Sequence, residues 1–190
     1  EQLKKGLIIT HKMTDEIGKK ILKGAKVLLM PDSTEFVKDQ VGGLFMTDYW
    51  NYRMFKTICE SNKKAVSPGT LGILTNPEHP IFNYFPTEMH TNWQWFPIIK
   101  ESHPAILDNL RKEYRPIVQV IDNIERNHKL GLIFEFQIGK GKLLICMSDL
   151  EKATKYPEGR ASYENVLRYM HSDKFCPSTH LSDINALKTM

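Results

Sequence analysis

Two short apolar runs near the N-terminus, separated by a capped amphipathic helix, constrain the fold more than any other part of the chain. Residues 6–10 and 27–30 have the length and composition of buried strands. Between them, Thr14 is suited to accept a hydrogen bond at a helix N-terminus, and Gly24 is suited to end that helix. This order predicts two adjacent parallel strands joined by a right-handed crossover.

Further along, helical patterns alternate with a proline-rich stretch. Residues 51–60 and 162–171 carry apolar side chains on one side and predict helices, and a short helix is expected around residues 183–187. Residues 75–104 hold five of the ten prolines. That stretch is therefore expected to be mostly loop with short helical pieces.

The last third is rich in strands. Residues 115–121 predict one strand, and residues 130–138 and 142–147 predict two more around a glycine-containing turn, which is typical of an antiparallel hairpin. Strands that alternate with helices and then form a hairpin predict an α/β sandwich with a mixed sheet.

Length and composition limit the functional classes. With 190 residues, 41% hydrophobic and 25% charged, the chain is expected to form one globular domain over residues 1–190. The net charge of +4 is spread along the chain, which does not favour a nucleic-acid partner, and no apolar run is long enough to predict a membrane span. Because the sequence begins Glu1-Gln2-Leu3 without Met, we expect it to be an excised piece of a longer protein.

Candidate catalytic residues lack the patterns that catalysis needs. Cys59, Cys146 and Cys176 lack the glycine pattern that a nucleophile at a tight strand-to-helix turn requires. Asp32 and Asp149 each follow a buried strand, where α/β proteins often bind ligands, but caps of the following turns explain them equally well. The sequence therefore predicts no catalytic residue.

Metal or cofactor binding has little support. His79, His90 and His103 are spaced more widely than the ligands of typical zinc sites. His90 with Glu88 is the one local pair that could share an ion. We expect neither a metal nor a cofactor.

Aromatic residues are concentrated between residues 82 and 96. Six of the 15 residues in this stretch are aromatic, whereas aromatic residues make up 10% of the whole chain. Aromatic rings can anchor a loop to the core, form a protein interface or stack on sugar rings, and all three remain open. The residues that we assign to a carbohydrate or interface role are Trp93, Trp95, Tyr84 and His90.

Seven stretches spread along the chain carry a resemblance to a known family. They are KVLLMP (26–31), SPGTLGIL (67–74), HPIFNYFPTE (79–88), HTNWQW (90–95), RPIVQVID (115–122), KLGLIFE (129–135) and GKGKLLIC (139–146). Together they resemble the C-terminal accessory region of glycoside hydrolase family 2 proteins. Those parents are the β-galactosidase-like and sugar-binding-domain proteins of gut Bacteroides-type bacteria.

The resemblance implies a class I glutamine amidotransferase-like fold. This is a flavodoxin-like α/β sandwich with a mostly parallel sheet and a C-terminal antiparallel hairpin, related to the trimerization domain of other β-galactosidases. The elbow cysteine of amidotransferases has no match here, and the glycosidase carboxylates belong to the parent's barrel domain. No catalytic residue is therefore carried over from either.

The implied function is that of a non-catalytic accessory domain of an O-glycosyl hydrolase that degrades carbohydrate. Its role would be structural, at an interface, or in shaping the parent's active site. The alternative is a carbohydrate-binding module that uses an aromatic platform. The implied partners are the parent's catalytic module, further copies of the chain in a homo-oligomer, and carbohydrate. The resemblance also implies a periplasmic or secreted location.

Overall fold

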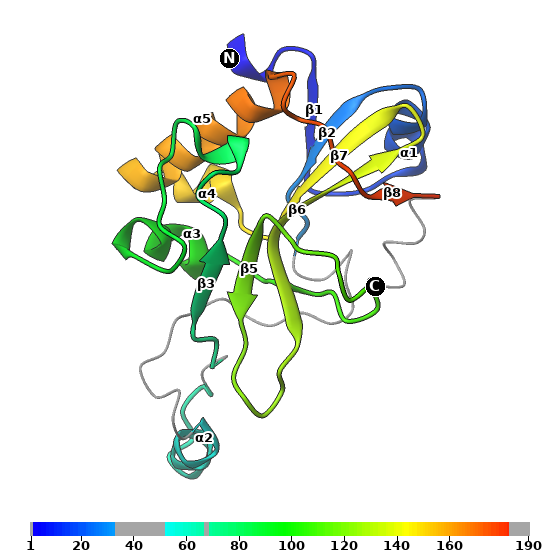
Figure 1. Cartoon of the computed structure of the whole chain (residues 1–190). Coiled ribbons are helices and arrows are strands. Elements are labelled where there is room, and N and C mark those ends of the chain that lie inside the picture. Colours follow the sequence, from blue (N-terminus) through cyan, green and yellow to red (C-terminus); the bar gives the residue numbers. More distant parts are fainter. Residues whose placement is uncertain (1, 33–51, 67–68, 183–190) are drawn as a thin grey trace.

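A single sheet with helices on both sides organises the protein (Figure 1). The computed structural model describes residues 2–32, 52–66 and 69–182. Its strands are β1 (Leu7–Thr10), β2 (Lys26–Leu29), β3 (Gly72–Thr75), β4 (Ala105–Ile106), β5 (Val118–Ile121), β6 (Lys129–Ile138), β7 (Gly141–Cys146) and β8 (His180–Leu181). Its helices are α1 (Asp15–Leu22), α2 (Tyr52–Ser61), α3 (Phe96–Lys100), α4 (Leu150–Ala153) and α5 (Pro157–His171), with 3-10 turns η1 (Gln2–Lys4), η3 (Pro80–Phe82) and η4 (Trp93–Trp95).

The strands follow the order β1-β2-β7-β6-β5-β3, and β4 and β8 also pair with β6. The predicted mixed α/β class is confirmed. The expectation of a mostly parallel sheet holds only for one half. β1, β2 and β7 run parallel, whereas β7, β6, β5 and β3 alternate in direction. The hairpin reverses the chain next to β7, and β5 and β3 continue the antiparallel pairing, whereas the short strand β8 pairs with β6 in parallel.

The predicted strand-helix-strand unit at the N-terminus is confirmed. β1 and β2 are adjacent and parallel, with Leu7 opposite Lys26. Thr14 Oγ1 accepts the Ile17 N–H at 3.3 Å, as expected for the helix cap. At the other end of α1, Gly24 has φ +119° and the Ala25 N–H donates to the Lys20 carbonyl, which is a Schellman ending. In Figure 1, α1 lies on one side of these strands and α5 on the other.

The predicted hairpin is also confirmed. β6 and β7 pair antiparallel from Ile133 opposite Cys146 to Ile138 opposite Gly141. The two-residue turn contains Gly139 at φ +58°, a conformation that glycine adopts without strain. Both strands are largely buried because helices cover the two faces of this part of the sheet.

Helix α5 is longer than the sequence pattern indicates. It begins at Pro157, five residues before the predicted start, because proline is favoured in the first turn of a helix. Gly159, a poor helix former, is accommodated by packing: a Cβ there would lie 2.0 Å from the Ala153 carbonyl oxygen of α4. Close contact between α4 and α5 thus accounts for a glycine that masks the helical pattern.

The middle of the chain agrees with expectation. Between residues 75 and 104 the regular structure consists of the short pieces η3, η4 and α3. On the apolar side of helix α2, the side chains of Tyr52, Phe55 and Cys59 are half-buried. The helix expected around residues 183–187 lies outside the described residues. Within the described part of the chain, no helix is both long and apolar enough to cross a membrane.

Gly141 provides a test of the contact between α1 and the hairpin. A Cβ at this position would lie 2.1 Å from the Ile21 carbonyl oxygen and 2.6 Å from that of Ala25. Since both are backbone atoms, we expect Gly141→Ala to lower the free energy of unfolding by about 1–3 kcal/mol in urea denaturation. The control is Lys140→Ala in the exposed turn, and equal effects of the two variants would contradict the packing argument.

Candidate functional site

Trp95 is a core anchor of the aromatic segment. Its side chain is only 1% exposed, and its indole N–H donates to Thr87 Oγ1 at 2.8 Å. The rings of Phe82 and Phe85 meet it edge to face, with centroids 6.2 and 5.5 Å away. Of the three roles left open by the sequence, the burial of Trp95 fits core anchoring and does not fit its assignment to a carbohydrate or interface role.

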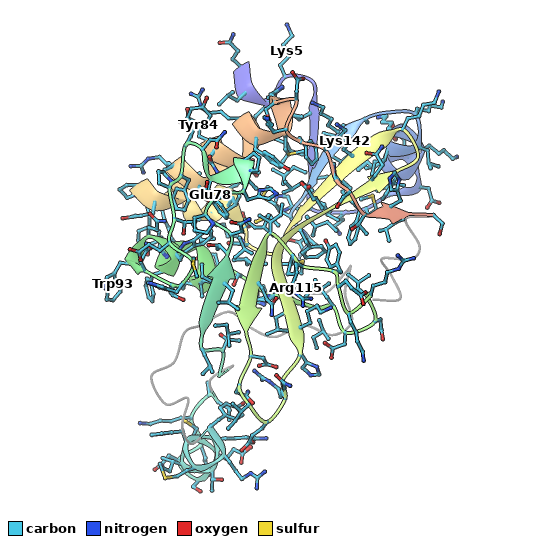
Figure 2. All side chains as sticks on the ribbon, viewed as in Figure 1. Lys5, Glu78, Tyr84, Trp93, Arg115 and Lys142 are labelled. Carbon is cyan, nitrogen blue, oxygen red and sulfur yellow. The ribbon has the colours of Figure 1, made fainter. Side chains whose placement is uncertain are left out.

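Trp93 and Tyr84 lie on the outside. Trp93 is 85% exposed and meets the half-exposed ring of Phe96 at a centroid distance of 5.8 Å. Tyr84 is 67% exposed, with the Arg168 guanidinium over its ring. Figure 2 shows Tyr84 and Trp93 on the left of the view. Trp93 and Trp95 therefore do not form one exposed surface.

Helix α5 holds the aromatic segment in place. Asn165 on α5 accepts the Tyr84 N–H at Oδ1, at 3.1 Å, and donates from Nδ2 to the Ile81 carbonyl. The end of the proline-rich stretch reaches the carboxyl end of β7, where the His103 N–H donates to the Met147 carbonyl at 2.7 Å. The proline-rich stretch thus ends near the carboxyl end of β7, while the aromatic segment itself is held by α5.

His90 is exposed and lies close to Glu88. Its Nδ1 is 3.7 Å from Glu88 Oε2, so the pair suggested by the sequence is adjacent in space. Among the described residues, no three histidine, cysteine or acidic side chains are grouped closely enough to hold a metal ion.

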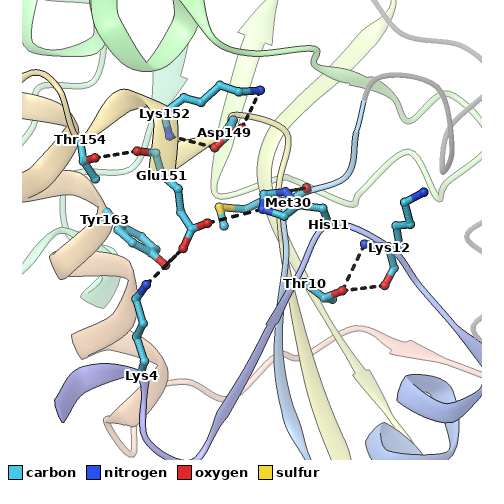
Figure 3. A network of polar contacts seen from close by, with 10 residues as sticks. All are labelled: Lys4, Thr10, His11, Lys12, Met30, Asp149, Glu151, Lys152, Thr154 and Tyr163. Carbon is cyan, nitrogen blue, oxygen red and sulfur yellow. Dashed lines mark hydrogen bonds and ion pairs between the residues drawn. The ribbon is translucent and has the colours of Figure 1, made fainter. Parts of the chain in front are cut away.

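The carboxyl ends of the parallel strands meet in a polar crevice. Asp32 and Asp149 both line this cavity of about 380 Å³, together with His11. Figure 3 shows the polar contacts that His11 and Asp149 make. The His11 Nδ1–H donates to the Met30 carbonyl at 2.8 Å, and Nε2 lies 3.5 Å from Glu151 Oε2. The structure thus brings together the two aspartates that the sequence placed after strands.

Neighbouring groups already engage Asp149, which lines this crevice, and Glu151, which lies outside its lining but close to His11. Asp149 caps α4 by accepting the Lys152 N–H at 2.9 Å, as one of its two sequence interpretations predicted. Burial works to raise the pKa of Asp149, but the hydrogen bonds from Lys152 outweigh it and the pKa lies below its usual value. Glu151 accepts from the Tyr163 hydroxyl at 2.9 Å, and this bond lowers its pKa. The crevice therefore resembles a structural network that joins α4 to the N-terminal strand.

A second cavity, not foreseen from the sequence, lies beside β6. It measures about 600 Å³, and Glu135, His79 and Tyr114 are among the residues that line it. Tyr169 on α5 donates its hydroxyl to Glu135 Oε2 at 2.9 Å. The available sequence clue was a glutamate inside an otherwise apolar strand, a position that requires a partner when it is buried.

Burial shifts the pKa values of Glu135 and His79, two of the ionisable groups that line this second cavity. Burial raises the pKa of Glu135, although the Tyr169 hydroxyl and the charge of Lys142 partly oppose the change. Burial likewise lowers the pKa of His79, whose Nδ1 accepts the Ile81 N–H and whose proton is therefore on Nε2. Burial thus disfavours the charged forms of these two side chains.

The cysteines remain apart from both cavities. Cys146 ends β7 and is fully buried, and burial raises the pKa of its thiol to about 12. A thiol with so high a pKa stays protonated at neutral pH and is a poor nucleophile. Cys59 lies half-buried on α2, and Cys176 is exposed.

Comparison with known protein families identifies the family to which the chain belongs. Residues 8–190 match a family described as a domain of unknown function, DUF8487. The chain belongs to this family. No curated protein matches the chain. The DUF8487 match covers every strand of the sheet except the first residue of β1, so the sheet as a whole is a property of the family's domain.

The docking of the aromatic segment on α5 of this DUF8487 domain is testable at Asn165. Asn165→Ala removes partners from the Tyr84 N–H and the Ile81 carbonyl at once. We expect a loss of about 2–3 kcal/mol in the free energy of unfolding, measured in urea. Glu164→Ala, which removes an exposed ion pair on the same helix, is expected to cost about 0.5 kcal/mol or less. Comparable losses in both variants would argue against Asn165 as the anchor.

The raised pKa of Glu135 predicts how stability changes with pH. A carboxyl group whose pKa is higher in the folded state than its usual 4.5 makes folding less favourable as the pH rises past 4.5. Glu135→Gln removes this ionisation. The variant should therefore gain stability relative to the wild type when the pH rises from about 4 to about 7 in urea titrations.

Glu151→Gln is the matched control with the opposite sign. The pKa of Glu151 is lowered, so its ionised form contributes stability above 4.5 that is lost as the pH falls. This variant should lose stability relative to the wild type as the pH rises. A Glu135→Gln difference that is independent of pH would refute the burial argument.

Proposed function

We propose that this chain is a non-catalytic accessory domain of a glycoside hydrolase family 2 protein of the β-galactosidase-like type. The seven stretches of sequence resemblance support this proposal, as do the β1-α1-β2 unit and the parallel strands β1, β2 and β7. A flavodoxin-like, glutamine amidotransferase-like ancestry would account for this half of the sheet. The antiparallel half is then the part that departs from that ancestor.

The observation that carries the proposal is an aromatic surface that is exposed although its backbone is firmly held. We use the name aromatic surface for the exposed side chains of Tyr84, Met89, Trp93 and Phe96, of which Trp93 and Phe96 are in ring contact. These residues provide four of the ten exposed large apolar side chains among the described residues, within 13 positions of sequence. Tryptophan and tyrosine are the residues that most often dominate binding at protein interfaces.

The partner that we propose for the aromatic surface is the catalytic module of the parent enzyme. Trp95 and Asn165 fix the segment, so little conformational entropy is lost when it binds. A role as a rigid accessory surface requires no reactive group in the domain. The protonated, buried thiol of Cys146 and the engaged carboxylates of the strand-end crevice agree with such a role.

The test measures association between this domain and the separately produced catalytic module by isothermal titration calorimetry. Trp93→Ala should weaken the association by at least about tenfold, because a central tryptophan at an interface contributes about 2 kcal/mol or more. The matched control is Ile124→Ala, another highly exposed apolar residue outside the aromatic surface. It should leave the affinity unchanged.

Three outcomes would replace the proposal. Unchanged affinity in Trp93→Ala would exclude the aromatic surface as the docking site. Sugar-dependent tryptophan fluorescence that is lost in Trp93→Ala would favour the carbohydrate-binding alternative. Concentration-dependent sedimentation of the isolated domain, lost in the same variant, would favour a homo-oligomer through this surface.

A further inference from the structure

The cavity beside Glu135 arises from a gap in strand pairing along one edge of β6. On this edge, β5 pairs with β6 as far as Ile133, and β8 pairs with Gln137 and Ile138. β7 occupies the opposite edge over the same stretch. Glu135 lies in the gap between β5 and β8, and its backbone carbonyl accepts from the Tyr114 hydroxyl at 3.3 Å instead of from a strand.

The gap leaves polar side chains with hydrogen-bonding capacity. Glu135 Oε2 is engaged by Tyr169, but Oε1 accepts no hydrogen bond from the described residues. The side chains of Gln119, Ser178 and Thr179 line the same cavity, and they too make no hydrogen bond within the described part of the chain. Donors and acceptors from three separate segments therefore converge on one space next to a carboxyl oxygen.

Acidic and basic side chains both lie around this cavity. Glu113 and Glu135 provide two carboxyl groups. Arg115, also in the lining, is held by hydrogen bonds to the carbonyls of Lys112 and Tyr114, and it lies near the centre of Figure 2. Lys142 on β7 acts on Glu135 from the neighbouring strand. A charged ligand would be repelled by the groups of its own sign, whereas an uncharged ligand would not.

We propose that the Glu135 cavity binds a small, uncharged polyhydroxy compound of about the size of a monosaccharide. Its hydroxyl groups would donate to Glu135 and exchange hydrogen bonds with Gln119, Ser178 and Thr179. The volume of about 600 Å³ falls in the range of small-molecule sites, roughly 300–1,000 Å³. A polyhydroxy ligand suits these residues because each hydroxyl group both donates and accepts.

This site shares no residue with the aromatic surface, and neither proposal depends on the other. The test is a titration of the isotopically labelled domain followed by NMR, with D-glucose and D-galactose as uncharged probes at up to tens of millimolar. Glucosamine and glucuronate serve as the cationic and anionic counterparts. We expect the uncharged sugars to shift the backbone amide signals of Glu135, Gln119 and Thr179, and the charged counterparts to bind more weakly.

Two variants test the role of the side chains. Glu135→Gln keeps an acceptor for the Tyr169 hydroxyl but replaces the free oxygen with an amide, and it should weaken sugar binding about tenfold. Gln119→Ala, at a half-exposed position on β5, should weaken it about fivefold. The control is Glu60→Gln on α2, outside the cavity lining, which should bind as the wild type does. Thermal melts establish that each variant is folded.

Several results would overturn the proposal. Absence of shifts with both uncharged sugars would exclude the ligand class, and tighter binding of glucosamine or glucuronate would show that charge is recognised. Shifts confined to the amides of Tyr84 and Trp93 would place sugar binding on the aromatic surface instead. By contrast, loss of catalytic-module binding in Trp93→Ala, with normal sugar shifts at Glu135, would support the proposal, because it would show that the two sites act separately.

Discussion

Strand β7 pairs in parallel with one neighbour and antiparallel with the other, and this determines most of the architecture. On one edge β7 continues the parallel β1-β2 pair, and on the other it forms the antiparallel hairpin with β6. Gly141 makes this arrangement possible because α1 packs its backbone carbonyls directly against the start of β7. The crevice at the strand ends and the cavity beside β6 lie in the two halves that this strand joins.

Local sequence signals predicted the elements better than their arrangement. Thr14, Gly24 and the turn at Gly139 act over a few residues, and each occupies the expected position. The insertion of β7 between β2 and β6 depends on contacts between distant segments, which no short pattern reports. The same holds for the two-residue strands β4 and β8, which are too short to show alternation and exist because β6 offers them an edge.

The candidate sites show the same division. The sequence located the aromatic segment but could not separate Trp95 from Trp93, because burial depends on how Asn165 on α5 orients the turn. The Glu135 cavity was missed because its residues come from β5, β6 and the segment after α5. What the sequence contained was a single acidic residue within an apolar strand. Its hydroxyl partner, Tyr169, was read only as an apolar residue of a helix.

The parallel pairing of β2 with β7 also sets the order in which the chain can acquire its structure. Lys26 of β2 pairs with Lys142 of β7, more than a hundred residues later. During synthesis on the ribosome, β1, α1 and β2 emerge long before their neighbour exists, and one edge of β2 stays unpaired throughout that time. The hairpin of β6 and β7 forms from adjacent residues and is fast by comparison. Completion of the sheet is thus a late event. If synthesis stops before residue 141, the released chain lacks β7, and β2 then has no strand to pair with on that edge.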